Sequence, residues 1–173
     1  MAFSVRAVTL ADVPAITRIY RQAVLEGTAT FELDPPDEAE MRSRMEGLLA
    51  GGFPYIVAEE NGRLQGYAYA AFYRTRPAYR FTVEDSIYIA SDAQRRGVGR
   101  ALLQELIVQS QARGFRQMVA VIGDSGNVGS IRLHAALGFR MTGTFEDVGF
   151  KFGRWLDSVM MQLALGDGAN SAP

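Results

Sequence analysis

The chain has 173 residues, 48% of them hydrophobic, and a net charge of −1, which predicts one folded domain and excludes both a disordered chain and a generally nucleic-acid-binding surface. It contains no cysteine and a single histidine, His134, so disulfides, acyl-cysteine intermediates and multi-histidine metal sites are excluded. No apolar run approaches the ~18 residues of a membrane span and no charged-then-apolar leader opens the chain, so we expect a soluble cytoplasmic protein.

Hydrophobic periodicity and turn residues divide the chain into alternating strands and helices. In chain order, the expected elements are a strand at 3–8, helices at 10–25 and 36–50, strands at 54–60, 63–73 and 82–90, a helix at 97–113, a strand at 116–122, a helix at 126–137, and strands at 140–149 and 155–165. This order predicts an α/β (α+β) domain over 1–165, with a mixed sheet and helices on both faces. Residues 166–173 are small, polar and aperiodic, and we expect them to be disordered.

A basic, glycine-bearing loop joins the strand at 82–90 to the helix at 97–113. The first N–H groups of a helix have no helical partner and lie at the positive end of its dipole. Gly97 and Gly99 allow an anion to reach the main chain. Three arginines add positive charge: Arg95, Arg96 and Arg100. The pattern favours a bound pyrophosphate; an ordinary strand–helix loop is the alternative. Leu102 stands where a dinucleotide-binding fingerprint needs its third glycine.

Two motifs here resemble those of the GNAT acyltransferase superfamily. Gln94-x-x-Gly97-x-Gly99 is similar to its motif A, and the segment 127–139, Asn-x-x-Ser-Ile-Arg-Leu-His-x-x-Leu-Gly-Phe, is similar to its motif B. The resemblance implies the GNAT fold, whose mostly antiparallel sheet splays between the strands near 82–90 and 116–122. It also implies acetyl-CoA as cosubstrate and no metal.

The resemblance further implies which residues contact acetyl-CoA. The loop at 95–100 holds the pyrophosphate, the strand at 87–89 pairs with the pantetheine arm, and a strand N–H stabilises the oxyanion. The implied cosubstrate residues are Ile87, Tyr88, Ile89, Arg95, Arg96, Gly97, Val98, Gly99, Arg100, Asn127 and Ser130.

Three more segments, 27–32, 79–89 and 149–157, resemble the phosphinothricin acetyltransferase group. Members of that group acetylate the α-amine of small amino-acid analogues such as phosphinothricin, methionine sulfoximine and methionine sulfone, and they are typically homodimers. Direct attack in a ternary complex is the simplest route without a cysteine. The dimer is expected through the last hairpin, at Lys151, Arg154 and Trp155. A peptide N-acetyltransferase and a non-catalytic acyl-CoA-binding module are the alternative functions.

Glu84 is the candidate general base, because partial burial would raise its pKa toward the working range; an exposed strand glutamate is the alternative. Strand alternation places Glu84, Ser86 and Tyr88 on one face, and Asp85, Ile87 and Ile89 on the other, unless a bulge intervenes. The GNAT fold implies such a bulge, and Asp85 is the second candidate base. His134 stands where the family has its thiolate-protonating group; packing within its helix is the alternative role.

The expected acceptor-binding residues lie in two loops. Arg74, Thr75 and Arg76 follow the strand at 63–73, where an arginine suits a bidentate clamp on an α-carboxylate; a solvated loop is the alternative. Phe31 is expected to wall the pocket with Tyr79 behind it, and Asp85 to contact the acceptor beside Glu84.

Overall fold

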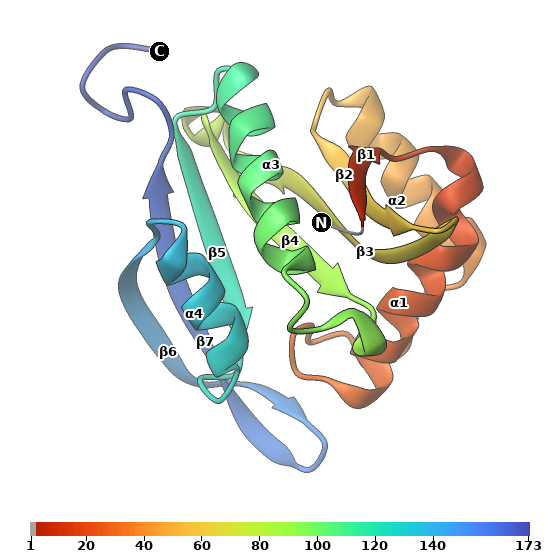
Figure 1. Ribbon diagram of the computed structural model, residues 1–173. Coiled ribbons are helices and arrows are strands. Elements are labelled where there is room, and N and C mark those ends of the chain that lie inside the picture. The colour runs from red at the N-terminus through yellow and green to blue at the C-terminus, as the bar shows by residue number, and fades with distance from the viewer. Residues whose placement is uncertain (1–2) are drawn as a thin grey trace.

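The computed structural model describes residues 3–173, in which seven strands form one sheet in the order β1-β2-β3-β4-β5-β7-β6 (Figure 1). The elements are β1 (Ser4–Ala7), α1 (Val13–Glu26), α2 (Glu38–Ala50), β2 (Tyr55–Glu60), β3 (Arg63–Phe72), β4 (Thr82–Ile89), α3 (Val98–Ala112), β5 (Gln117–Gly123), α4 (Val128–Ala136), β6 (Arg140–Lys151) and β7 (Arg154–Ala164). Every expected strand and helix is present. Only the β4–β5 pair is parallel, so the predicted mixed, mostly antiparallel sheet is confirmed.

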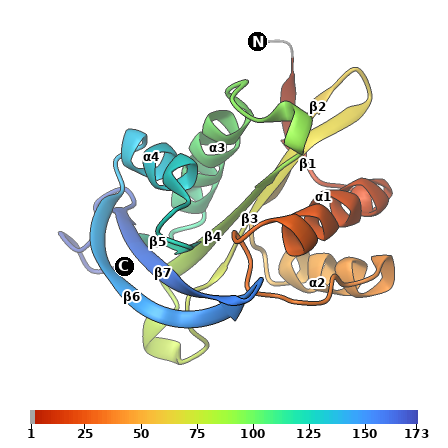
Figure 2. The same cartoon turned by 90° about the horizontal axis from the view of Figure 1, so that it is seen from below.

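The helices cover both faces of the sheet, as Figure 2 shows from below, with α1 and α2 on one side and α3 and α4 on the other. The predicted helix start at residue 10 is wrong by three positions. Thr9 N–H donates to Asp12 at 2.7 Å, so residues 10–12 form a 3-10 turn and α1 begins at Val13. The second helix begins after Asp37, whose side chain accepts from the Glu40 N–H.

The sheet splits between its two central strands. β4 pairs with β5 only where Thr82–Glu84 face Gln117–Val119, although β4 continues to Ile89. Beyond that point the two strands diverge (Figure 1). The predicted splay is therefore confirmed, and the edge of β4 that faces the split carries main-chain groups without a strand partner.

The pairing of β4 with β3 runs without a register shift from Val83 to Ile89, so the bulge expected in this strand is wrong. Simple alternation holds instead. Tyr88 packs edge-on against Tyr20 of α1 at 4.9 Å, while Asp85 is directed to the opposite face and contacts His134 of α4. Glu84 and Asp85 therefore lie on opposite faces of one strand beside the split.

The hairpin of β6 and β7 extends past the end of the sheet toward the loop between α1 and α2 (Figures 1 and 2). Two register shifts bend β6, after Met141 and after Phe145. Gly149, Lys151 and Leu156 share the hairpin face that meets the α1–α2 loop, whereas the opposite face is exposed to solvent.

Residues 166–173 form turns, and Arg116 donates to the Ser171 hydroxyl and the Ala172 carbonyl, each at 3.0 Å. The single domain over 1–165 and the disorder of its tail stay predictions. No helix in residues 3–173 combines the length and the apolar character needed to cross a membrane.

Candidate active site

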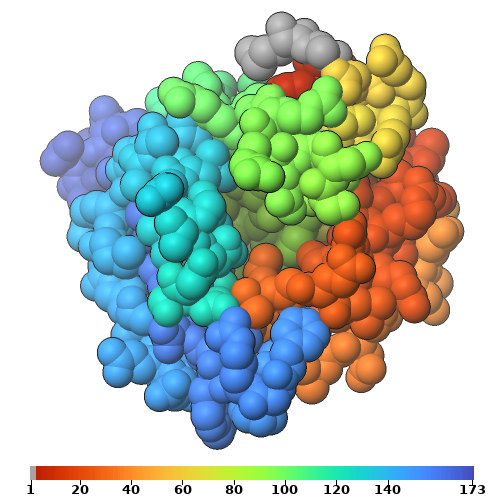
Figure 3. All heavy atoms as spheres, turned by 60° about the horizontal axis from the view of Figure 1, so that its bottom comes forward, coloured from red at the N-terminus to blue at the C-terminus, as the bar shows by residue number. Residues whose placement is uncertain are grey.

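Two cavities meet at the split between β4 and β5. The larger one, of about 860 Å³, lies between α1, the loop before α3, and α4. The smaller one, of about 350 Å³, lies deeper in the split and reaches Glu84. Six residues line both cavities: Ala29, Ile87, Tyr88, Asn127, Ser130 and His134. Figure 3 shows the hollow between α4, the loop before α3 and the α1–α2 loop.

The larger cavity is built around the N-terminus of α3. Gly97 adopts a left-handed φ of +86°, which turns the chain sharply into the helix. The first helical bond runs from the Ala101 N–H to the Gly97 carbonyl at 3.1 Å, so the N–H groups of residues 98–100 have no helical partner. Arg95 and Arg100 line the cavity beside them. This donor set fits the pyrophosphate of acetyl-CoA.

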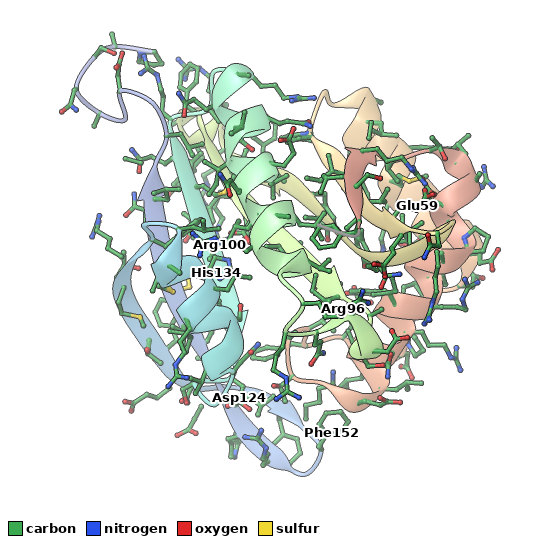
Figure 4. All side chains as sticks on the ribbon, in the orientation of Figure 1. Glu59, Arg96, Arg100, Asp124, His134 and Phe152 are labelled. Atoms are coloured by element: carbon green, nitrogen blue, oxygen red, sulfur yellow. The ribbon has the colours of Figure 1, made fainter. Side chains whose placement is uncertain are left out.

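Arg96 does not line either cavity, although the sequence predicted it at the pyrophosphate (Figure 4). Its guanidinium pairs with Glu60 at 2.7 Å and donates to Gln65 at 3.3 Å. Arg63 pairs with Asp92 at 2.6 Å in the opposite direction. These contacts tie the loop before α3 to the β2–β3 turn. The Val98 side chain is buried in the core, so only its main-chain N–H would be available to an anion.

The N-terminus of α4 forms the opposite wall. The side chain of Asn127 caps the helix by accepting from the Ser130 N–H at 3.3 Å, and both residues line the cavities. Asp124 and Arg154 also line the larger cavity, where they form an ion pair (Figure 4 labels Asp124). The sequence analysis missed Asp124, whose only local signal is an Asp-x-Gly turn before the helix cap.

Glu84 lines the smaller cavity in a half-buried position. Burial raises the pKa of its carboxyl to about 7, the Asp85 charge adds to the increase, and Arg74 opposes it. A carboxyl with a pKa near neutrality accepts a proton efficiently at physiological pH. The burial expected for Glu84 from sequence is present.

Asp85 and His134 form a buried pair at the base of the split, 7% and 3% exposed. His134 Nδ1 lies 2.8 Å from the Ser130 carbonyl, which only accepts, so Nδ1 carries a proton. Nε2 lies 3.0 Å from Asp85 Oδ2, and this contact needs a second proton. Burial lowers the pKa of His134, but Asp85 raises it further, to a value above its ordinary one. The other oxygen of Asp85, Oδ1, is buried without a hydrogen-bond partner among the described residues.

The residues expected to bind the acceptor are divided between two places. Phe31, Glu84 and Asp85 line the smaller cavity. Arg74, Thr75, Arg76 and Tyr79 are exposed and line neither cavity. The Arg74 guanidinium lies over the Tyr73 ring, 4.2 Å from its centroid.

Lys151 is 4% exposed, and its amine donates to two main-chain carbonyls of the same chain. Lys151 is therefore enclosed within its own chain, and its expected part in a dimer through the last hairpin stays a prediction. Trp155, in contrast, is 60% exposed and packs edge-on against Phe150 at 5.2 Å. The Arg154 guanidinium forms an ion pair with Asp124 of its own chain.

No group of three or more histidine, cysteine, aspartate or glutamate side chains within residues 3–173 is arranged to hold a metal ion. The arrangement combines an anion-binding helix N-terminus, strand N–H groups beside a split, and a carboxyl with a raised pKa. Such a site is able to bind a phosphorylated acyl donor and remove a proton from an amine.

Comparison with known proteins places this geometry in context. The family model described as acetyltransferase (GNAT) domain matches residues 5–160. Phosphinothricin N-acetyltransferase from Alcaligenes faecalis is 54% identical, over 99% of this chain and 87% of that protein. L-methionine sulfoximine/L-methionine sulfone acetyltransferase from Pseudomonas paraeruginosa is 42% identical over 100% of both chains. The crystal structure of a GNAT superfamily phosphinothricin acetyltransferase from Sinorhizobium meliloti in complex with acetyl-CoA superposes with a TM-score of 0.97 at 49% identity, covering 100% of this chain and 94% of that one.

Proposed function

The chain belongs to the GNAT family of acetyltransferases and is an acetyl-CoA-dependent N-acetyltransferase, and from this premise we propose that it acetylates the α-amine of a small amino-acid-like acceptor. The acceptors we propose are phosphinothricin, methionine sulfoximine and methionine sulfone, which relatives at 42–54% identity are named for. The observation that carries the proposal is the position of Glu84 in a cavity of about 350 Å³, a volume suited to a small molecule.

In the proposed reaction, Glu84 accepts a proton from the acceptor ammonium, directly or through a water. The amine nitrogen then attacks the carbonyl carbon of the thioester, and a new C–N bond forms. The C–S bond breaks, the sulfur leaves with the bonding electron pair, and the second amine proton passes to the departing CoA thiolate, directly or through solvent, as the amide forms. We propose direct transfer in a ternary complex, which is the simplest route for a chain that has no cysteine to carry an acyl group.

The split supplies the electrostatic part of the reaction. We assign the pyrophosphate to the loop before α3 and the pantetheine arm to Ile87, Tyr88 and Ile89, whose main-chain groups face the gap. One of these N–H groups stabilises the developing oxyanion, where a fixed donor is most effective. Asn127 and Ser130 hold the other side of the arm.

We assign His134 to hold Asp85 in place beside the acceptor, since both ring nitrogens are already engaged. The thiolate-protonating role expected from sequence would need Nε2 to leave Asp85. Arg74 is the candidate carboxylate clamp because its charge already reaches Glu84. Arg76, Thr75 and Tyr79 would need the segment after β3 to move toward the cavity.

We also propose that two copies associate through the exposed face of the β6–β7 hairpin. Five large apolar side chains of β6, β7 and the turn between them are each at least 55% exposed: Phe145, Val148, Phe150, Phe152 and Trp155. Large exposed apolar side chains gathered together on a small protein mark an interaction site, and the hairpin extends toward the loop between α1 and α2. Light scattering should give a molar mass of two chains for the wild type and of one chain for the Trp155→Glu variant.

The decisive experiment for the reaction is thiol release from acetyl-CoA. The protein contributes no thiol background, because it has no cysteine. The panel contains phosphinothricin, methionine sulfoximine, methionine sulfone, ordinary amino acids, polyamines and short peptides. Release with the analogues supports the proposal. Release with peptides alone would replace the acceptor class, and acetyl-CoA binding without release would favour a binding module.

A further inference from the structure

The first part of the α1–α2 loop, residues 27–32, lines both cavities and is called the acceptor loop below. Its start, residues 27–29, lines the larger cavity, and residues 29–31 line the smaller one. Both flanking helices fasten it. The Tyr20 hydroxyl of α1 lies 3.1 Å from the Thr30 hydroxyl, and Arg44 of α2 pairs with Glu32 at 2.6 Å.

A third attachment comes from the far end of the chain. Lys151, the last residue of β6, donates from Nζ to the Gly27 carbonyl and to the Thr30 carbonyl, each at 2.9 Å. The amine thus bridges the two ends of the segment that passes from one cavity to the other. Gly27 is the C-cap of α1, where the helix dipole favours a cation.

Two glycines provide a slot for the aromatic ring of this loop. A Cβ atom placed on Gly149 of β6 would lie 2.5 Å from Cε2 of Phe31 and 2.7 Å from its Cδ2. A Cβ atom on Gly123, at the end of β5, would collide first with the Thr28 carbonyl oxygen of the acceptor loop, and it would lie 3.0 Å from Cε1 of the Phe31 ring. Real Cβ atoms do not approach other atoms so closely, so the ring position depends on Gly149, and Gly123 leaves room for both the loop backbone and the edge of the ring.

From these contacts we propose that the β6–β7 hairpin positions the acceptor loop. In this arrangement Lys151 fixes the loop backbone, and the slot of Gly123 and Gly149 seats the Phe31 ring against the wall of the smaller cavity. Lys151 and Gly149 are then positioning residues that determine acceptor affinity. The inference rests on the proposed function, because it takes the smaller cavity as the acceptor site.

The first test is Gly149→Ala, assayed with the acceptor that the wild-type enzyme uses. The added methyl group displaces the Phe31 ring, so the acceptor KM should rise roughly tenfold. The acetyl-CoA KM and the far-UV circular dichroism spectrum should stay at wild-type values, because Phe31 lines only the smaller cavity. Gly143→Ala is the matched control, because Gly143 lies on the same strand and a Cβ placed on it has no neighbouring atom within 4 Å.

A double-mutant cycle identifies Phe31 as the group through which Gly149 acts. In a Phe31→Ala background the ring is gone, and Gly149→Ala should then leave the acceptor KM unchanged. This background also protects the test from misfolding, because no ring remains for the methyl group to meet. Independent effects of the two substitutions would overturn the proposal.

Lys151 is tested by a pair of variants. Lys151→Met removes the amine and should raise the acceptor KM several-fold more than the acetyl-CoA KM. Lys151→Arg keeps N–H donors at the same site and should recover part of the loss. Equal increases in both KM values, or no recovery, would reduce Lys151 to a structural role and overturn its part of the inference.

The two hypotheses fail in different ways. Wild-type protein that binds acetyl-CoA but transfers to no small amine overturns the proposed function, and the inference with it. Wild-type protein that is active, with a Gly149→Ala variant of unchanged acceptor KM, overturns the inference alone.

Discussion

The two cavities that meet at β4 are constructed in different ways. The larger one takes its anion-binding groups from one continuous stretch, the loop before α3 and the first turn of that helix. The smaller one takes its chemistry from side chains on separate elements, with Glu84 and Asp85 on β4, His134 on α4 and Phe31 on the acceptor loop. In the proposed function, binding of the donor is thus a local property of the chain, and catalysis is a property of its tertiary structure.

The largest expected effect separates chemistry from donor binding. Glu84→Gln removes the proposed base, and kcat should fall by roughly 10²–10³. The acetyl-CoA Kd, measured by calorimetry, should stay unchanged, because the larger cavity does not include Glu84. Glu46→Gln, at an exposed position in α2, serves as the control. A kcat within threefold of wild type would remove Glu84 from the base role.

The acid limb of the pH dependence of kcat/KM should report the protonation of Glu84 in the smaller cavity. With the Glu84 pKa at about 7, kcat/KM should fall about tenfold for each pH unit below that value as the base becomes protonated. Asp85→Asn removes a charge that raises this pKa, so the limb should move to lower pH. His134→Gln removes the partner of Asp85 and should move the limb to higher pH. Shifts in one common direction would contradict the proposed electrostatic coupling.

A smaller effect should appear in the donor cavity alone. Gly97→Ala places a Cβ on a backbone with φ +86°, which costs about 1–2 kcal/mol and disturbs the first turn of α3. The acetyl-CoA Kd should rise roughly five- to tenfold, with the acid limb unchanged. Gly114→Ala is matched to it, with φ +84° at the opposite end of α3 and open space around the Cβ. Equal changes in Kd for the two variants would show a general loss of stability.

The smallest effect is on stability. Folding raises the pKa of Glu84 from 4.5 to about 7. Burial of this carboxyl therefore costs no folding free energy below pH 4.5, where it is protonated, and destabilises the folded state increasingly as the pH rises toward 7. Glu84→Gln removes this loss, and at pH 8 the free energy of unfolding of the variant should exceed that of the wild type by about 1 kcal/mol. At pH 4.5 the two proteins should be equal in urea titrations. A variant that is less stable at pH 8 would contradict the burial of this charge.

The same contrast explains what the sequence could predict. Gly97, Gly99 and the adjacent arginines form one local motif, so the sequence and its family resemblance could predict a donor site there, although Arg96 turns to Glu60. The Asp85–His134 contact joins residues 49 positions apart and depends on how α4 packs over the split. The segment at 74–79 was placed at the acceptor by resemblance, but no local pattern fixes the direction of an exposed loop.

The predicted start of α1 and the predicted bulge in β4 were wrong for a related reason. α1 begins later than predicted because the Asp12 side chain accepts a hydrogen bond from the Thr9 N–H, which favours a turn over a helix at residues 10–12. Arg6 holds the Asp12 carboxylate in this position through a hydrogen bond of 2.8 Å. The expected bulge in β4 came from the family rather than from the residues. The chain alone predicts the plain alternation that the structure shows.

The burial of Lys151 has a consequence for an enzyme that carries a reactive acetyl donor. The chain has 17 arginines and this one lysine, and the lysine amine is enclosed by the acceptor loop. Guanidinium groups are poor nucleophiles because they stay protonated at any cellular pH. The folded enzyme therefore exposes no lysine to self-acetylation, and the positive charge of its arginines is preserved however long it is incubated with its own donor.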